Sequence, residues 1–505
     1  MHVRKLACLG LLGVGLILAL LPATAGAYQI QDNQVATSFD GTPIVYTLFF
    51  PDNASASSPV PVVMRTHGWG GSRENTATGF VQQLLDNGFG VLTWDSRGFG
   101  QSGGTVEIDS PDFEARDASA LIDVLQADPR VLKRSGDPVV GMSGGSYAGG
   151  IQWVTAARDH RVDAIAPEIS WHNLLQSLYP ETVVKTGWGT LLYAAGQTAV
   201  TGGADPMDPA GPQTGNYDPA IHQAFVEGST TGTFSQATQD FFAHRGPDYL
   251  LRNVIAPTFI IQGTIDTLFP PDQGAKNFAA MKKLRPHVPL KMAWYCSGHG
   301  TCSPFNAGPA GYIPGQIIKW FDRYLKGDTS VNTGTKFEYV TDDGVWHGAG
   351  NYPVPRTTNR SASGSGIISV NGGVTATGLL PGSDAPASLE IPLPSQPGTL
   401  IGAPTVTLTE NALGTATDEP NQVTTFFQIV NKTKNEVLGN QITPKVFASD
   451  GVDHTYTFQI EPVSYTVDPG DQLVLQIAST SASYEPYRGG AVVNFKNVQV
   501  NVPQR

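Results

Sequence analysis

The sequence predicts an α/β domain with a mostly parallel β-sheet, followed by a second, all-β domain. Between residues 44 and 326, short runs of β-branched and apolar residues alternate with amphipathic stretches of helical length. After about residue 332 the helical periodicity ends, and short alternating segments separated by Gly, Pro and Asn follow. A chain of 505 residues also exceeds what one hydrophobic core accommodates, so at least two domains are expected.

The first domain is expected to span residues 28–332. Its strand-like runs are Ile44–Phe50, Val60–Met64, Gly90–Trp94, Pro138–Met142, Ala164–Pro167, Pro257–Gln262 and Leu290–Tyr295. Amphipathic helices are expected at Thr78–Asn87 and Phe113–Gln126, and a closing helix at Ile317–Leu325. Strands that alternate with helices in this way favour a parallel sheet covered by helices on both faces.

The interval of about 171–245 interrupts this alternation. It combines Trp, Tyr and Leu with a Gly/Pro/Asp-rich stretch at Gly202–Asp218 and an expected helix at Ser235–Phe242. We expect an inserted helical cap over the carboxyl edge of the sheet. The alternative is an ordinary pair of crossover helices with long loops.

The second domain is expected to span residues 333–505. Alternating segments occur at Thr405–Thr409, Thr424–Ile429, Thr455–Gln459 and Leu473–Ile477. Many short strands with turn residues between them are typical of a β-sandwich or jelly roll. Ser361–Gly366 has the composition of a flexible connection.

Residues 1–27 have the pattern of a secretory signal peptide. Arg4 and Lys5 precede an apolar run from Leu6 to Pro22, and Ala25-Gly26-Ala27 offers a cleavage site. A membrane anchor is the alternative, although the run is short. We therefore expect a secreted protein, extracellular or periplasmic. No later stretch is long and apolar enough to span a bilayer, so no stable membrane association is expected.

Charge and cysteine content limit the partners of the protein. The net charge of −12 becomes more negative when Arg4 and Lys5 are removed, which disfavours nucleic acid as a partner. Beyond residue 27 the cysteines are Cys296 and Cys302. In an oxidising compartment these two predict a disulfide, because two thiols alone are too few ligands for a metal site. Closing so short a loop contributes about 2 kcal/mol of stability.

The segment from Pro138 to Trp153 has the pattern of a nucleophile elbow. A strand runs into a glycine-rich turn and then a helix, which places a serine hydroxyl near backbone N–H groups at a helix N-terminus. Two serines compete for this role. Ser143 fits the G-x-S-x-G template literally, whereas Ser146 fits it with Ala148 in the last place and sits at the expected turn.

The run Val140–Trp153 resembles the elbow of the cocaine-esterase and X-Pro dipeptidyl-peptidase family, the CocE/NonD acyl hydrolases. In that family G-x-S-Y-x-G carries the nucleophile, which assigns it to Ser146 rather than to Ser143. The resemblance covers most of the chain, including Thr399–Leu408 near the start of the second domain. It implies an α/β-hydrolase core with a helical cap, followed by a C-terminal β-sandwich of the jelly-roll type.

The resemblance also implies an oxyanion hole. The turn His67-Gly-Trp-Gly70 follows a strand and has the H-G-x-G pattern, which supplies the backbone N–H of Trp69. The second N–H is that of Tyr147, the residue after the nucleophile. The cocaine-esterase branch uses a tyrosine side chain in this region, and the loop after the strand contains none. His67 is interpreted as part of the loop architecture.

The segment Asp95–Ser102 resembles the D-x-R-G-x-G-x-S loop of the family. Asp95 and Arg97 are expected to tie loops together rather than to act on substrate. For the catalytic acid we favour Asp266, which follows a buried strand and a glycine turn. Asp272 is the rival and lies further from the strand end, after two prolines.

The expected base is His299, in the loop after Leu290–Tyr295. This histidine stands between two glycines and inside the expected Cys296–Cys302 disulfide, which would hold it in place. The order Ser146, Asp266, His299 is that of α/β-hydrolases.

The leading hypothesis is a serine hydrolase that cleaves an ester or amide of a small molecule or peptide through an acyl-enzyme, without metal or cofactor. An acyl esterase is favoured over an X-Pro dipeptidyl-peptidase, because no anionic group for a free amine is identified in the cap. A catalytically silent binding protein that uses the β-sandwich is the alternative from another class. The oligomeric state, the acyl group and the leaving group stay open.

Overall fold

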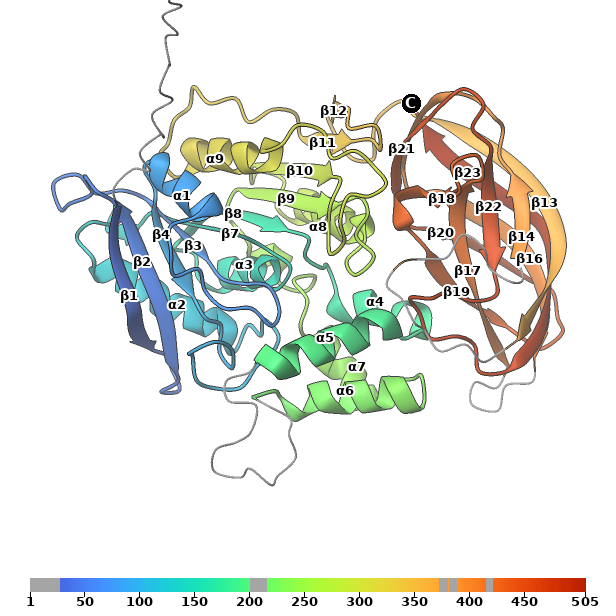
Figure 1. Ribbon diagram of the computed structural model, residues 1–505, viewed down its shortest axis with the longest axis horizontal. Helices are drawn as coiled ribbons and strands as arrows, with labels where there is room; N and C mark the ends of the chain where they lie inside the picture. Colours follow the sequence, from blue (N-terminus) through green and yellow to red (C-terminus); the bar gives the residue numbers. More distant parts are fainter. Residues whose placement is uncertain (1–27, 200–215, 372–379, 381–387, 415–420) are drawn as a thin grey trace, which may run out of the picture.

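The computed structural model describes residues 28–199, 216–371, 380, 388–414 and 421–505. The expected signal peptide and most of Gly202–Asp218 lie outside these ranges. An α/β domain and a β-sandwich lie side by side in Figure 1, with the sandwich drawn in orange and red. Within the described ranges, no helix has the length and hydropathy needed to cross a membrane.

A ten-stranded sheet forms the centre of the first domain, in the order β1-β2-β4-β3-β7-β8-β9-β10-β11-β12. The strands from β4 to β11 in this order are parallel, and β1, β2 and β12 join antiparallel at the two edges. Their bounds are β1 Tyr28–Thr37, β2 Pro43–Pro51, β3 Val62–Arg65, β4 Gly90–Trp94, β7 Val140–Gly145, β8 Val162–Glu168, β9 Thr258–Gly263, β10 Leu290–Tyr295, β11 Phe337–Val340 and β12 Trp346–Ala349. A two-stranded hairpin, β5 Lys133–Arg134 and β6 Asp137–Pro138, lies before β7.

Helices cover both faces of this sheet, as the alternation of elements predicts. On one face are α1 Gly79–Asp86 and α9 Tyr312–Tyr324; on the other are α2 Glu114–Ala127, α3 Tyr147–Arg158 and α8 Pro271–Leu284. Strand residues alternate between the two cores: in β9, Phe259 and Ile261 pack with α1 and α9, whereas Ile260 packs with the other helices. Burial on both faces explains why the central strands are almost continuously apolar.

The sheet continues past residue 332, where the sequence analysis ends the first domain. β11 pairs in parallel with β10, and its residues Phe337 and Tyr339 are fully buried in the core of the first domain. β12 then closes the edge by pairing antiparallel with β11. The first strand of the second domain, β13, begins at Thr358. No helix follows β11 or β12 before β13, and β12 has mixed burial, so the alternation of strands and helices that marks the first domain in the sequence does not continue here.

The interval between β8 and β9 is helical. It contains α4 Leu174–Leu178, η1 Pro180–Thr182, α5 Thr186–Ala199, α6 Pro219–Thr230, α7 Gln236–Ala243 and, just before β9, η2 Leu251–Asn253. In Figure 1, α5, α6 and α7 form a separate layer below the sheet and its covering helices. This interval packs its own apolar cluster, which includes Trp171, Phe234 and Phe242, against Tyr147 and Phe269 of the sheet domain.

The second domain consists of two packed antiparallel sheets. One has the order β20-β16-β23-β15-β21 with β13 joined to β23, and the other has the order β14-β22-β17-β18 with β19 joined to β17. The bounds are β13 Thr358–Asn371, β14 Ser388–Pro392, β15 Gly398–Gly402, β16 Thr405–Gly414, β17 Gln422–Asn431, β18 Glu436–Val437, η3 Leu438–Asn440, β19 Thr443–Ala448, β20 His454–Gln459, β21 Val463–Val467, β22 Leu473–Ala478 and β23 Gly490–Gln504.

The flexible connection expected at Ser361–Gly366 is wrong, because these residues lie inside β13 and pair with β23. The small residues serve packing instead. A Cβ on Gly364 would lie 3.0 Å from Ile391, and one on Gly366 would lie 2.5 Å from Leu389. Glycine therefore allows β14 to approach β13 closely, and a register irregularity falls between the two glycines.

Candidate active site

The turn between β7 and α3 carries Ser146 in a strained backbone conformation. Its φ of 61° and ψ of −122° are rare for a residue with a side chain, and such strain costs on the order of 1–3 kcal/mol. A hydrogen bond from the Ser146 N–H to the Glu168 carbonyl, at 3.0 Å, holds the turn to β8. A Cβ on Gly149 would collide with the same carbonyl oxygen, and one on Gly144 would lie 2.7 Å from Ala148. The glycines thus allow the close packing that the turn requires.

Ser143 occupies a different environment from Ser146. It lies inside β7, is 1% exposed, and its Oγ accepts a hydrogen bond of 2.9 Å from Nη1 of Arg65. Ser146 lines a pocket. The literal match to the G-x-S-x-G template therefore falls on a buried strand residue.

Ser146, His299 and Asp266 form a continuous hydrogen-bonded chain. The distance from Ser146 Oγ to His299 Nε2 is 2.7 Å, and that from His299 Nδ1 to Asp266 Oδ2 is 2.8 Å. Asp266 is fully buried, and its Oδ1 accepts hydrogen bonds of 2.9 Å from the backbone N–H groups of Leu268 and Phe269. These bonds fix the carboxylate, so its other oxygen can orient the imidazole ring.

The rival acid, Asp272, lies in the first turn of α8. Its carboxylate pairs with Lys276 one helical turn away. Residues 267–271 separate Asp272 from Asp266 in sequence, and Asp272 pairs within α8 rather than with His299. The structure thus brings Asp266, and not Asp272, to the histidine.

The loops that follow β9 and β10 pack backbone against backbone. Gly298 has a φ of 146°, and a Cβ there would lie 2.5 Å from the Cβ of Asp266. A Cβ on Gly263 would collide with the Ser297 carbonyl. Glycine at these positions allows His299 and Asp266 to come within hydrogen-bonding distance.

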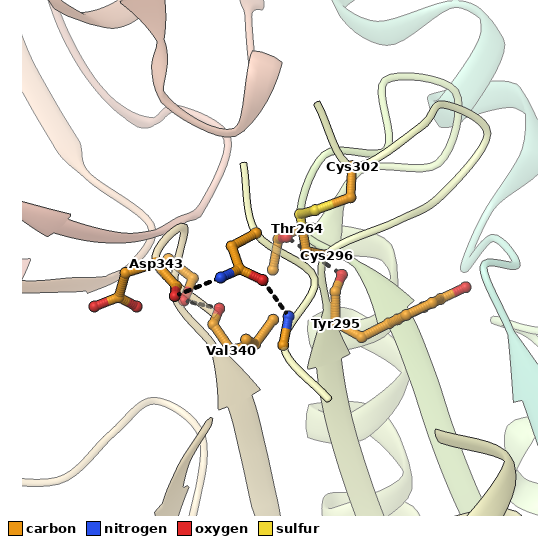
Figure 2. Close-up of a disulfide and its surroundings, with 9 residues drawn as sticks. Thr264, Tyr295, Cys296, Cys302, Val340 and Asp343 are labelled. Atoms are coloured by element: carbon orange, nitrogen blue, oxygen red, sulfur yellow. Dashed lines mark hydrogen bonds between the residues drawn. A yellow bond between two sulfur atoms is a disulfide. The ribbon is translucent and has the colours of Figure 1, made fainter. Parts of the chain in front are cut away.

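Cys296 and Cys302 form a disulfide across the loop that carries His299, with their Cα atoms 5.4 Å apart. Figure 2 shows this bond at the end of β10, next to Thr264 of the preceding loop. The backbone N–H of Thr264 donates to the Tyr295 carbonyl at 2.9 Å. Cys296 belongs to a small buried cluster with Ile265 and Val340, and Cys302 packs against this cluster. The histidine loop is therefore closed covalently and anchored to the loop of the acid.

The two residues expected to supply oxyanion N–H groups both border Ser146. Tyr147 is the first residue of α3, where backbone N–H groups have no acceptor within the helix. Trp69 lies in the loop after β3, and a Cβ on its neighbour Gly68 would lie 4.0 Å from Ser146 Cβ. The Trp69 indole donates to the Leu192 carbonyl of α5 at 2.8 Å and contacts the Tyr147 ring edge-on. The loop is thus anchored to α5 and to Tyr147.

His67, at the start of this loop, is buried and holds the loop to its neighbours. Its Nε2 accepts from the Ser96 N–H at 3.0 Å, and its Nδ1 donates to the Gly68 carbonyl at 2.8 Å. Burial lowers the pKa of this histidine. Both ring nitrogens are engaged, which leaves neither for a substrate.

Asp95 and Arg97 also have structural partners. Asp95 accepts from the backbone N–H groups of Arg73 and Gln101. Arg97 makes two hydrogen bonds of 2.7 Å to the carboxylate of Asp117, the arrangement that arginine and carboxylate favour. These contacts connect the Asp95–Ser102 loop to the segment of Arg73 and to α2.

A pocket opens beside Ser146, between the sheet domain and α4–α7. It encloses about 930 Å³ of empty space, open mouth included, and its wall is mostly apolar. Its aromatic members include Trp69, Trp171, Tyr193, Phe225, Phe234 and Phe242. In the ranges that the structure describes, no group of three or more His, Cys, Asp or Glu side chains is arranged to hold a metal ion.

Two residues near the site were missed by the sequence analysis, and both support the acid loop. Lys185 is buried, and its Nζ donates hydrogen bonds of 2.9 Å to the carbonyls of Thr267 and Leu268. Burial lowers its pKa to about 8. Gln441, from the second domain, donates from Nε2 to the carbonyl of Asp266 at 3.0 Å. A lysine or glutamine outside a helix or strand is typically a surface residue, so the sequence contained no signal for either.

Two buried carboxyl groups behind Tyr147 were missed as well. The Tyr147 hydroxyl donates to Glu114 at 3.2 Å, and Asp109 is fully buried beside α3. Burial raises the pKa of Glu114 to about 7 and that of Asp109 well above its usual range. Burial thus disfavours the charged form of both carboxyl groups.

Comparison with known proteins identifies the family. Residues 40–300, just over half of the chain, match the X-Pro dipeptidyl-peptidase family, the S15 family. The chain belongs to this family. This confirms the resemblance carried by residues 140–153, and the chain is a hydrolase of the CocE/NonD and S15 type.

Solved structures of two hydrolases share the fold over nearly the whole chain. An α-amino acid ester hydrolase superimposes with a TM-score of 0.71 at 14% identity, covering 95% of this chain and 97% of that one. A CocE/NonD family hydrolase of Staphylococcus aureus superimposes with a TM-score of 0.68 at 13% identity, covering 94% and 93%. These likenesses confirm an α/β-hydrolase core with a C-terminal β-domain.

A curated relative matches over a shorter stretch. The Escherichia coli protein YcjY is 25% identical over 140 residues, which is 27% of this chain and 44% of YcjY. This chain therefore spans less than half the length of the curated relative that it matches.

Proposed function

We propose that the protein is a secreted serine esterase that hydrolyses carboxylic esters through an acyl-enzyme. The observation that carries the proposal is the hydrogen-bonded chain from Ser146 through His299 to Asp266, with Ser146 in the wall of a pocket. A serine, a histidine and a buried carboxylate in this order form the arrangement that activates a serine hydroxyl.

In the proposed reaction, Ser146 Oγ attacks the ester carbonyl while its proton passes to His299 Nε2. The tetrahedral intermediate carries its negative charge on the former carbonyl oxygen, held by the backbone N–H groups of Trp69 and Tyr147. His299 then donates the proton to the leaving alkoxide, and the acyl group stays on Ser146. Water, deprotonated by His299, releases the acid and restores the serine. Asp266 keeps the imidazole in the required tautomer and stabilises its cation.

The N–H groups of Trp69 and Tyr147 are proposed for the oxyanion because their residues flank Ser146 on two sides. Tyr147 also begins α3, so the helix N-terminus adds its partial positive charge at the same point. Loss of one such donor costs about 10²–10³ in kcat in comparable sites.

Labelling of the nucleophile tests the proposal directly. A fluorophosphonate probe should label the wild type and the Ser143→Ala variant but not Ser146→Ala, and p-nitrophenyl acetate hydrolysis should fall by at least about 10³-fold in Ser146→Ala alone. Labelling that survives Ser146→Ala would contradict the assignment. A protein that neither labels nor hydrolyses esters would favour the binding role of the β-sandwich.

The family match makes an X-Pro dipeptidyl-peptidase the second candidate. Kinetics on p-nitrophenyl esters and on Gly-Pro and Ala-Pro anilides separate the two activities. Faster turnover of the proline anilides than of the esters would reverse our order.

Secretion is proposed from residues 1–27 and the Cys296–Cys302 disulfide, which persists in oxidising compartments. Mass spectrometry of the exported protein should find an N-terminus at Tyr28. A retained N-terminal segment on an exported, membrane-bound chain would favour the anchor instead.

A further inference from the structure

The pocket beside Ser146 adjoins the bond that the acyl group forms with the enzyme. Its wall includes Ser146, Trp69 and Tyr147, and also Phe269, whose ring contacts that of His299 edge-on. In the proposed reaction the leaving group departs next to His299 Nε2, because it takes its proton there. The acyl group stays on Ser146 with its oxygen toward Trp69 and Tyr147. Because Ser146 itself lines the pocket, we assign the pocket to the acyl group that Ser146 carries.

The wall has no carboxylate to bind an amine. Among the lining residues that the structure describes there is no Asp or Glu, and the one charged side chain is that of Lys185. The nearby acids lie outside this wall: Asp266 holds His299, Glu114 accepts from the Tyr147 hydroxyl, and Asp109 is fully buried beside α3. A free α-ammonium group in this pocket would lose its hydration without gaining a counter-ion.

The shape and chemistry of the wall suit a hydrocarbon chain. Tyr193 of α5 stacks on Phe225 of α6 with ring centroids 4.0 Å apart, and Phe234 and Phe242 continue this surface. Burial of apolar surface against such a wall stabilises a bound chain in proportion to its length.

We propose that the pocket selects an uncharged, aliphatic acyl chain and discriminates against acyl groups with a free α-amine. This inference rests on the proposed esterase function. The substrates are then esters of simple carboxylic acids, and acyl groups longer than acetyl are preferred. This specificity differs from that of an enzyme for amino-terminal X-Pro dipeptides, whose substrates carry an α-ammonium group.

Gly189 of α5 is a specificity-determining position in this proposal. It lines the pocket between Thr186 and Tyr193, which lie on the same helical face at spacings of three and four residues. A Cβ on Gly189 would meet no atom within 4 Å. A larger side chain at this position would therefore enter empty space and shorten the pocket.

A matched pair of substrates tests the inference on the wild-type protein. The p-nitrophenyl esters of hexanoate and of norleucine have the same carbon chain and differ by the α-ammonium group; the 2-methylhexanoate ester controls for branching. We expect kcat/KM to rise about fourfold per methylene from acetate to hexanoate. We expect the norleucine ester to be at least about tenfold poorer than the 2-methylhexanoate ester, after subtraction of spontaneous hydrolysis.

The Gly189→Leu variant tests the location of the chain. It should lower the ratio of hexanoate to acetate kcat/KM by at least about tenfold. Gly315→Leu is the matched control, because Gly315 also lies in a helix with no atom within 4 Å of a built Cβ, and α9 covers the sheet on the side away from α5 (Figure 1). The control should leave the ratio unchanged.

The outcomes separate this inference from the proposed function. Fluorophosphonate labelling at Ser146 together with equal or faster turnover of the norleucine ester would overturn the acyl specificity and leave the esterase intact. An unchanged ratio in Gly189→Leu would overturn the location of the chain. Absence of both labelling and ester hydrolysis would overturn the esterase itself, and the inference with it.

Discussion

Single residues set the geometry around Ser146. A left-handed backbone at Ser146 and glycines at positions 144, 149 and 298 let segments approach each other more closely than side chains would permit. At Gly298 the neighbour is Asp266, and His299 follows directly in the chain. The position of the histidine therefore depends on the absence of a Cβ one residue before it.

The Gly298→Ala substitution should impair catalysis more than stability. Its methyl group would collide with the Asp266 side chain in a backbone conformation that alanine disfavours, so the distance from His299 to Ser146 would change. We expect kcat to fall by at least about tenfold, because proton transfer is sensitive to small displacements. Steady-state kinetics on p-nitrophenyl acetate measure the effect.

Gly300→Ala is the matched control for this substitution. Gly300 flanks His299 on the other side, and a Cβ there would meet no atom within 4 Å. Equal activity of the two alanine variants would show that the contact with Asp266 does not position the histidine.

Glu410 in β16 is a single residue with an effect on stability. Its side chain is fully buried in the sandwich, and within the described part of the chain neither carboxylate oxygen has a hydrogen-bond partner. Burial raises its pKa to about 7. From about pH 4.5 to 7 the folded protein keeps a proton that the unfolded chain has lost. The free energy of unfolding therefore decreases as the pH rises through this window, and the loss persists above it.

Glu410→Gln should remove this pH dependence. Relative to wild type, the variant should be more stable at pH 8 than at pH 5 by about 1–2 kcal/mol. Urea unfolding at the two pH values, followed by a signal from the second domain, measures the difference. If the free energies of unfolding of variant and wild type differed by the same amount at both pH values, the raised pKa of Glu410 would be contradicted.

At the scale of elements, the Cys296–Cys302 loop connects β10 to the site. The disulfide closes a loop of a few residues, so its effect on the unfolded chain is modest, about 2 kcal/mol. Its effect on the folded state is local, because His299 lies between the two cysteines and the bond packs against Ile265 of the acid loop.

The paired Cys296→Ala and Cys302→Ala substitution should therefore lower kcat by at least about tenfold while the free energy of unfolding falls by no more than about 2 kcal/mol. Reduction of the wild type, verified by thiol counting, should give the same result. Unchanged turnover after verified reduction would show that the disulfide does not position His299.

At the scale of the whole molecule, the β-sandwich contacts the loop that carries Asp266. Gln441 donates to the carbonyls of Asp266 and Thr264, at 3.0 and 3.2 Å. Gly439 approaches the same loop so closely that a Cβ would lie 2.8 Å from the Thr264 carbonyl. From the cap, Lys185 donates to the next two carbonyls of the loop. The loop that carries Asp266 is thus held by two other parts of the protein, the β-sandwich and the cap.

Gln441→Ala should lower kcat as well as stability. Loss of the amide leaves two buried carbonyls without this donor, which costs about 1–3 kcal/mol, and frees the loop that orients Asp266. Gln428→Ala is the matched control, because Gln428 is a buried glutamine of β17 that bonds to Gln476 inside the sandwich. Both variants should lose stability, and kcat at a temperature where both are folded should fall only in Gln441→Ala. Equal kcat in the two would assign Gln441 a purely structural role.

Much of this organisation is readable in the sequence because it depends on local patterns. The bounds expected for β4 and β10 agree with the structure, since each is a short apolar run between turn residues. The order Ser146, Asp266, His299 is readable because each residue follows a strand, and the carboxyl ends of parallel strands meet at one edge. The glycine-rich turn around Ser146 follows from the same local constraint on the backbone.

Other features depend on contacts between segments far apart in the chain, so no local pattern reports them. The Ser361–Gly366 stretch has the composition of a linker, yet packing against Ile391 and Leu389 makes it a strand. Lys185 and Gln441 reach the acid loop only because the cap and the sandwich fold against it. The sequence by itself determined the chemistry of the site, since that chemistry follows from residue types at turns. Only the tertiary structure decided which residues line the pocket and what holds Asp266 in place, because burial and distance arise from packing.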